Sequence, residues 1–263
     1  MKAYSAVLKA RLSVLLQYRS AALAGLATQI FWGFIKVMIL EAFYAQSGAA
    51  EPLTLAQAIT FIWLGQAFLQ LIPWNIDKEL EQQIKTGNVA YELLRPLDLY
   101  FLWFFRAVAM RLVPALMRSI PLFLFAGVVY ALPAPVSLHA AIAFIFSLSA
   151  AILLSSAITT LVIISLFWTI SGEGIQRLLP HITLLLSGMT VPLPLFPSWT
   201  QPFLNLQPFR GIIDIPSRIY VGIIPTHDVF QYIGFQLVWF LFFVLAGKWL
   251  LKRAIKRFVI LGG

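Results

Sequence analysis

The side chains best able to do chemistry in this sequence lie in one short stretch, residues 77–98. It holds eight charged residues: Asp77, Lys78, Glu79, Glu81, Lys85, Glu92, Arg95 and Asp98. Residues 52–76, directly before it, contain no Asp, Glu, Lys or Arg. Because its carboxylates outnumber its lysines, the stretch suits docking to a soluble protein better than binding to anionic lipid. The alternative is an amphipathic loop that rests on lipid headgroups.

The pattern within this stretch predicts a helix, a tight turn and a second short helix. Apolar residues recur at every fourth position, at Ile76, Leu80 and Ile84, which is typical of one face of a helix. Gly87 suits a left-handed helix end, and Asn88 suits the cap of the next helix. The charged stretch is therefore expected to form a helical hairpin exposed to water.

Motifs for catalysis by this chain are absent from the sequence. It contains no GxxxxGK followed by Ser or Thr, no HExxH, no CxxC and no GxSxG. P-loop nucleotide binding, zinc proteolysis and serine hydrolysis therefore lack their residues. With three histidines and no cysteine, we expect no metal site and no catalytic residue. Any energy source is expected on a separate molecule.

Several basic residues lie inside or beside apolar segments. We expect Arg106, Arg111 and Arg118 to lie at the membrane interface, with their long side chains reaching lipid phosphates. The alternative is a substrate- or lipid-binding role for Arg111 and Arg118. Lys36 is expected to extend outward from the first span. His181 has no acidic neighbour in the sequence that would support a proton relay.

The composition is that of a membrane protein. Apolar residues make up 60% of the chain and charged residues 11%, against about a quarter charged in soluble domains. Apolar runs of about 20 residues can cross a bilayer as helices, and the alternation of barrel strands is absent. The sequence predicts an all-α integral membrane domain with six transmembrane helices: 21–44, 56–74, 114–132, 138–168, 178–192 and 229–250.

The segments between these spans have their own patterns. Residues 1–20 predict an amphipathic helix at the membrane interface. Residues 75–98 contain the water-exposed hairpin. Residues 193–226 are rich in proline and in apolar side chains, which predicts short re-entrant helices on the extracellular face.

The basic residues indicate orientation rather than nucleic-acid binding, despite a net charge of +9. Of the 19 basic residues, all except Lys36, Arg210 and Arg218 fall on one side of the predicted spans. Positive residues favour the cytoplasmic side. Both termini and the hairpin are therefore expected in the cytoplasm.

One run of residues is similar to a known family. The sequence Gly87-Asn88-Val89-Ala90-Tyr91-Glu92-Leu93-Leu94-Arg95-Pro96 resembles the Gly–…–Leu-Leu-Arg-Pro signature of one bacterial branch of type-2 ABC exporter permeases. The amphipathic start, the six spans, the hairpin after the second span and the proline-rich segment after Ser187-Gly188-Met189 are also similar to that family. The resemblance covers essentially the whole chain and implies the permease subunit of an ATP-driven exporter in the bacterial inner membrane.

The resemblance implies partners and site residues. Two cytosolic ATP-binding subunits would carry ATP and magnesium, and a second permease chain, identical or homologous, would complete the complex within membrane lipid. The hairpin would act as the coupling helix, and the loop between the fourth and fifth spans, Ser171-Gly172-Glu173-Gly174, would make a second contact. The implied coupling residues are Glu79, Glu81, Lys85, Gly87, Asn88, Glu92, Leu94, Arg95, Pro96 and Glu173. The implied translocation-path residues are Gln66, Phe68, Leu185 and Met189, which suit amphipathic or lipid-like cargo.

Other functions stay open at this point. The chain could be the membrane component of an ATP-driven uptake system, which would need the same hairpin. It could also be an integral-membrane enzyme acting on lipids, or a structural scaffold. Substrate-stimulated ATP hydrolysis in the assembled complex would distinguish a transporter from the last two.

Overall fold

A computed structural model describes residues 2–17, 19–46, 51–94, 96–169 and 173–262, with side chains for 4–14, 25–46, 51–94, 96–169 and 173–256. Every regular element among the described residues is helical, which confirms the all-α part of the predicted fold class, and the count of six spans stays a prediction. Four helices are long and apolar enough to cross a bilayer: α2 (Arg19–Gln46), α6 (Leu99–Tyr130), α7 (Leu138–Ser165) and α11 (Val229–Gly262). The chain is therefore a multi-pass membrane protein.

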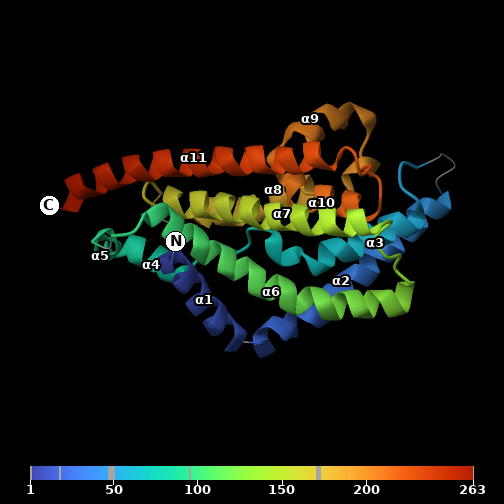
Figure 1. The fold of residues 1–263 in the computed structure, drawn as a ribbon, viewed down its shortest axis with the longest axis horizontal. Coiled ribbons are helices and arrows are strands. Elements are labelled where there is room, and N and C mark those ends of the chain that lie inside the picture. The colour runs from blue at the N-terminus through green and yellow to red at the C-terminus, as the bar shows by residue number, and fades with distance from the viewer. Residues whose placement is uncertain (1, 18, 47–50, 95, 170–172, 263) are drawn as a thin grey trace.

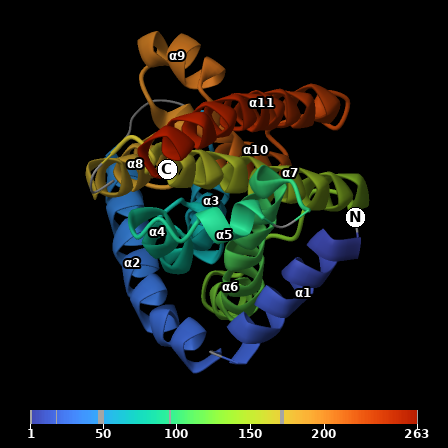
Figure 2. The same ribbon diagram turned by 90° about the vertical axis from the view of Figure 1, so that its left-hand side faces the viewer.

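The charged hairpin, residues 77–98, and the proline-rich segment lie toward opposite ends of an elongated helical body (Figure 1). The helices α4 (Lys78–Lys85) and α5 (Ala90–Leu93), together with the last turns of α11, lie at one end. The helices α9 (Gln201–Leu206) and α10 (Asp214–Tyr220) lie toward the other. In both views α11 runs beside α7 (Figures 1 and 2).

The predicted amphipathic start of the chain is a helix, α1 (Lys2–Gln17). It packs against α6. The Tyr4 ring stacks on Phe105 with 5.7 Å between centroids, and Val7 and Leu8 pack partly buried against the apolar cluster around α6. The apolar face of α1 therefore covers protein, and the location of the helix at a membrane interface stays a prediction.

The second predicted span is helical only in its first half. The helix α3 (Leu55–Ala67) is capped by Thr54, whose side chain forms a capping box with Gln57. The helix buries Phe61 and Trp63 in the main apolar core. A short 3-10 helix, η1 (Leu69–Leu71), follows, and no regular element is assigned from there to α4. The expectation of a continuous helix over 56–74 is wrong in this half.

Polar side chains satisfy the backbone where α3 unwinds. Gln29 Nε2 of α2 donates to the carbonyl oxygen of Gln66 at 3.0 Å. The hydroxyl of Ser155 on α7 donates to the carbonyl oxygen of Leu71. Irregular backbone at membrane depth is tolerated where protein groups supply its hydrogen bonds. These two side chains explain why the chain can leave the helix inside an apolar body.

The third predicted span begins earlier than expected. We expected a span to start at residue 114, with Arg106 and Arg111 before it at the membrane interface. Instead α6 is one helix of 32 residues that starts at the Asp98 cap and contains Pro114 and Pro121. Proline inside a membrane helix is tolerated because neighbouring groups and local adjustments satisfy the freed carbonyls.

The fifth predicted span and the segment after it contain short helices. The helix α8 (Glu173–Leu186) has 14 residues, includes Pro180 and ends before the expected boundary at 192. Residues 193–226 form η2 (Leu193–Leu195), η3 (Ser198–Thr200), α9, η4 (Pro208–Gly211) and α10. The expectation of short helices in this segment is confirmed, and their re-entrant placement on the extracellular face stays a prediction.

Candidate functional site

The first helix of the charged hairpin, residues 77–98, is set by a capping aspartate and an apolar stripe. Asp77 Oδ1 accepts hydrogen bonds from the backbone N–H groups of Glu79 at 3.0 Å and Leu80 at 3.4 Å. A side chain at this position satisfies N–H groups that have no partner within the helix. The predicted stripe of Ile76, Leu80 and Ile84 is buried. Helix α4 therefore presents one face to the body and one to solvent.

The turn after α4 follows the prediction at one residue and departs from it at the next. Gly87 has φ +79°, which confirms the left-handed helix end. Asn88 does not cap the second helix, because Val89 occupies that position with no side-chain cap. The Val89 N–H donates to the carbonyl of Gln83 at 3.0 Å, and its side chain is buried. Burial of Val89 fixes the turn and leaves Asn88 exposed.

Arg106 of α6 joins three carboxylates of the hairpin. Its Nε donates to Asp77 Oδ2 at 2.7 Å, and its Nη2 donates to Glu79 Oε2 at 2.8 Å. Its Nη1 lies 3.7 Å from Glu92 Oε1, and Glu92 Oε2 accepts from Trp103 Nε1 at 2.8 Å. The side chain of Arg106 is only 6% exposed. Our expectation that it reaches lipid phosphates is therefore wrong. It attaches the hairpin to α6.

Contacts from the two ends of the chain hold the hairpin further. Arg11 of α1 forms an ion pair with Glu79. The hydrogen bond from Arg11 and the charge of Arg106 lower the pKa of Glu79 against the opposing effect of burial. The hydroxyl of Tyr4 accepts from the Asp98 N–H at 2.8 Å, and Lys248 Nζ of α11 lies 2.9 Å from Asp98 Oδ2. The hairpin is thus bound to α1, α6 and α11.

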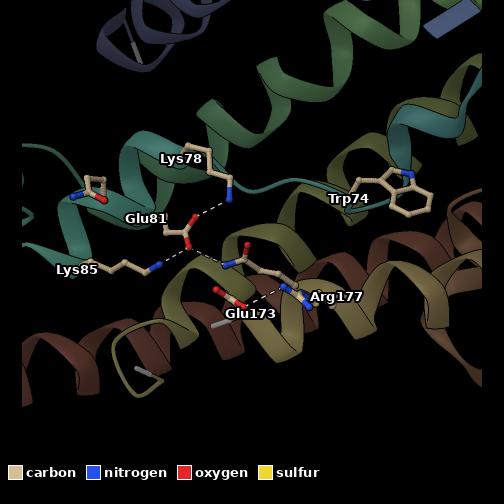
Figure 3. Close-up of a pocket in the computed structure, with 8 residues that line it drawn as sticks. Trp74, Lys78, Glu81, Lys85, Glu173 and Arg177 are labelled. Carbon is tan, nitrogen blue, oxygen red and sulfur yellow. Dashed lines mark hydrogen bonds and ion pairs between the residues drawn. The ribbon is translucent and has the colours of Figure 1, made fainter. Parts of the chain in front are cut away.

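A polar groove of about 540 Å³ lies between α4 and α8 (Figure 3). Glu81 lies at its wall and accepts hydrogen bonds from Lys78 at 3.0 Å, Lys85 at 2.9 Å and Gln176 of α8 at 3.3 Å. Burial opposes ionisation of Glu81, but these three donors outweigh it and lower its pKa to about 2. Glu81 therefore stays charged at neutral pH and links the hairpin to α8.

Glu173, from the loop predicted to make the second contact with a partner, lies beside the hairpin. Glu173 at the start of α8 lines the same groove as Glu81 and Lys85. Its carboxylate is exposed and accepts from Arg177 Nη2 at 3.3 Å. Ser171 and Gly172 lie outside the described residues. A protein that touched the outward face of α4 would therefore meet Glu173 as well.

The predicted coupling residues divide into two groups. Glu79, Glu81 and Glu92 are engaged by the chain's own side chains, and Arg95 lies outside the described residues. Lys85, Asn88, Leu94 and Pro96 face solvent, and so does Tyr91. Leu94 is 81% exposed and Tyr91 72% exposed. The hairpin therefore has an inner face that attaches it and an outer face with uncovered apolar side chains.

Arg111 and Arg118 lie deeper along α6. Arg111 is 3% exposed and donates to Ser155 Oγ at 2.7 Å, to the hydroxyl of Thr159 and to the carbonyl of Ala107 at 3.2 Å. It lies inside the helical body, contrary to our expectation of an interfacial arginine. Arg118 is half-buried, and a Cβ added at Gly25 of α2 would lie 2.9 Å from its guanidinium.

The predicted path residues are not all on one surface. Gln66, Phe68 and Met189 are buried within the chain, whereas Leu185 is exposed. Phe68 packs against the rings of Phe123 and Phe144 at 5.8 and 5.9 Å. Its position in the apolar core gives it a packing role in this chain.

Sequence reasoning predicted Lys85 as a coupling residue but missed several other residues that hold the site, Lys78 among them. Lys78 and Lys85 flank Glu81 at spacings of three and four residues, which is a readable signal for ion pairing on a helix. Trp103, Gln176 and the partners supplied by α1 and α11 carry no such signal, because they come from distant parts of the chain.

Comparison with known proteins identifies a family. A family model described as ABC-2 family transporter protein matches residues 23–262. A search of the curated proteins finds no match.

Proposed function

This chain belongs to the ABC-2 transporter family, and on that premise we propose that it is the permease subunit of an ATP-driven exporter. Two separate ATP-binding subunits bind the hairpin and hydrolyse ATP with magnesium, while this chain and a second permease chain, identical or homologous, form the translocation path. Members of this family are membrane transport components, so hydrolysis belongs to the partner. Export as the direction comes from the resemblance of the hairpin signature.

The two-faced hairpin is the observation that carries the coupling role. Its inner face is attached by Arg106 at 2.7 and 2.8 Å to carboxylates of α4. Its outer face leaves Tyr91 and Leu94 largely exposed beside Lys85 and Asn88. Apolar side chains rimmed by polar ones are typical of a surface that a protein partner covers.

The connections of the hairpin offer a route for motion. Toward the amino-terminal side, residues 72–76 join α4 to η1 and the unwound end of α3. On the other side of the groove, Gln176 joins Glu81 to α8. Displacement of α4 by an ATP-binding subunit would therefore move both segments that the family resemblance assigns to the path. Gln66, Phe68, Leu185 and Met189 lie on or next to these segments.

Six crossings are consistent with this arrangement. As a helix, the 13 residues of α3 rise only about 20 Å, against a hydrocarbon core of about 30 Å. The 3-10 helix η1 and the residues after it extend the crossing, with Leu71 and Ile72 buried within the chain. The hairpin and the last turns of α11 lie at the same end of the body (Figure 1), which requires an even number of crossings between them. We place that end in the bacterial cytoplasm because it carries most basic residues.

Co-purification tests the proposal. The tagged chain, extracted from its own membrane in mild detergent, should carry a stoichiometric soluble subunit with a P-loop. Leu94→Asp should abolish this association while leaving the chain folded, because Leu94 makes part of the outer face. Leu206→Asp is the matched control, since Leu206 is 70% exposed on α9 at the other end. Retention of the subunit by Leu94→Asp, or loss by Leu206→Asp, would contradict the coupling role.

A further inference from the structure

An apolar groove with a single cation lies on the face of α2. It has a volume of about 410 Å³. Its walls are Trp32, Ile39 and Phe43 of α2, Ile62 of α3, and Val191 and Pro192 after α8. Lys36 is the charged residue among the side chains that line it. Grooves in this size range commonly hold small-molecule ligands, with apolar walls and few polar groups.

Lys36 lies at a costly position for a charge. It is near the middle of the candidate span Gly25–Gln46, and its Nζ donates to the carbonyl oxygen of Met189 at 2.8 Å. It therefore does not extend outward to the interface as the sequence suggested. No carboxylate of the described side chains lies within ion-pairing distance of it. A lysine ammonium has three N–H donors, so two are left for a ligand.

We propose that this groove binds a single-chain amphiphile with an anionic headgroup, the headgroup at Lys36 and the alkyl chain along Ile39, Phe43 and Val191. Charged residues inside membrane spans commonly mark substrate pathways, and an anion would compensate the charge of Lys36. One cation and about 410 Å³ suit one headgroup and one chain better than a two-chain phospholipid. That the occupant is transported cargo rests on the proposed export function, since Met189 is also a predicted path residue.

A second groove provides an internal control. It has a similar volume, about 390 Å³, and is lined by Ile142 and Phe146 of α7 and by Val229, Phe230 and Ile233 of α11. No lysine or arginine is among its lining residues, which do include His139. An amphiphile held only by apolar contact would bind both grooves, whereas an anionic headgroup distinguishes the groove that contains Lys36.

The binding experiment uses the purified chain in phosphatidylcholine nanodiscs without any ATP-binding subunit. The probe is 11-(dansylamino)undecanoic acid, and its methyl ester is the uncharged control. We expect the acid to bind about tenfold more tightly than the ester, the size of one charge-assisted hydrogen bond. Equal affinity of acid and ester for the unaltered chain would overturn the proposal, whether or not any variant folds.

Variants locate the site. Lys36→Met should remove the preference for the acid, and Lys36→Arg should keep it. Ile39→Trp should weaken both probes by filling the groove, while Ile142→Trp in the control groove should change neither. An unchanged acid affinity in Lys36→Met, or a loss in Ile142→Trp, would place the probe elsewhere and contradict the assignment.

A lipid titration separates cargo from bilayer lipid. Replacing part of the phosphatidylcholine by phosphatidylglycerol should leave the affinity for the acid unchanged. Displacement of the probe would assign the groove to a membrane phospholipid and overturn the assignment to a single-chain ligand. Because no ATP-binding subunit is present, failure of the export proposal would show in the co-purification experiment and leave these results unaffected.

Discussion

Two buried ion clusters lie toward opposite ends of this protein, and they are built in opposite ways. Near the hairpin, Arg106 pairs with Asp77 and Glu79 at 2.7 and 2.8 Å, and these two partners are 29 and 27 residues away in sequence. In the proline-rich segment, Asp214 lies between Arg210 and Arg218 at 3.5 and 3.6 Å, each four residues away.

The two clusters have different structural roles: one attaches a separate element, and the other supports neighbouring short helices. The cluster around Arg106 joins α4 and α5 to α6, so it positions a separate element. The cluster around Asp214 spans little more than one helix and supports the short helices around it, with the guanidinium of Arg210 also 5.6 Å from the Tyr232 ring. The proposed coupling role would need a firm attachment of the hairpin, whereas local charges are enough to hold α10 in place.

The largest effect is expected from Arg106→Met. It leaves Asp77 and Glu92 buried without a cation, and breaking a buried pair on one side costs about 3–5 kcal/mol. Urea titration in detergent should show this loss in the free energy of unfolding. The matched control is Arg177→Met, whose side chain is 82% exposed and should cost less than about 0.5 kcal/mol. Equal losses from the two variants would remove the attachment role of Arg106.

Asp214→Asn tests the other cluster and should cost less. Both arginines keep other partners, because Arg210 Nη1 donates to the Asn205 side chain at 2.6 Å and Arg218 lies 5.8 Å from the Tyr232 ring. We expect a loss of about 2 kcal/mol in the same titration, the size expected when buried polar groups lose part of their pairing. The hairpin should stay attached, so co-purification of the ATP-binding subunit should be retained. A loss larger than that of Arg106→Met would reverse the comparison.

The structural features that the sequence predicted correctly are those determined by residues close together in the chain. The apolar stripe that includes Leu80 and the left-handed Gly87 follow from local spacing and backbone sterics, and both are confirmed. Arg106 was misplaced because its partners come from another helix, and a long side chain beside apolar residues looks the same whether it reaches lipid or carboxylates. Hydropathy could not reveal the unwinding after Ala67, since the group that permits it, the amide of Gln29, lies on a different helix.

Acid should loosen the hairpin only at low pH, well below neutrality. The pKa of Glu81 is about 2 in the folded chain, below its ordinary value of 4.5. Its contribution to stability is therefore complete above about pH 4.5 and is lost as the pH falls toward 2. Because the chain has no cysteine, a spin label at Gln82→Cys reports α4 alone, and its mobility should stay constant from pH 7 to 5.

The Glu81→Gln variant provides the control for this titration. It should show raised label mobility already at pH 7, with about 1 kcal/mol lost from the free energy of unfolding. A label that becomes mobile between pH 7 and 5 in the unaltered chain would mean that a group other than Glu81 holds α4 to α8.

The smallest effect is expected where α11 meets the hairpin. Lys248 Nζ lies 2.9 Å from Asp98 Oδ2, and both side chains are more than a third exposed. Lys248→Met should therefore cost only about 0.5 kcal/mol in the urea titration. Asp98→Asn should cost a similar amount, because asparagine still caps α6 and only the charge is lost.

The double variant then measures the pair. If the ion pair is the shared cause, Lys248→Met combined with Asp98→Asn should cost no more than either single change. Additive losses would mean that Lys248 acts through the Phe101 ring, which lies 4.1 Å from its Nζ, and not through Asp98. In that case the attachment of the hairpin would rest on α1, α6 and α8, which would make the contrast with the Asp214 cluster depend still more on Arg106.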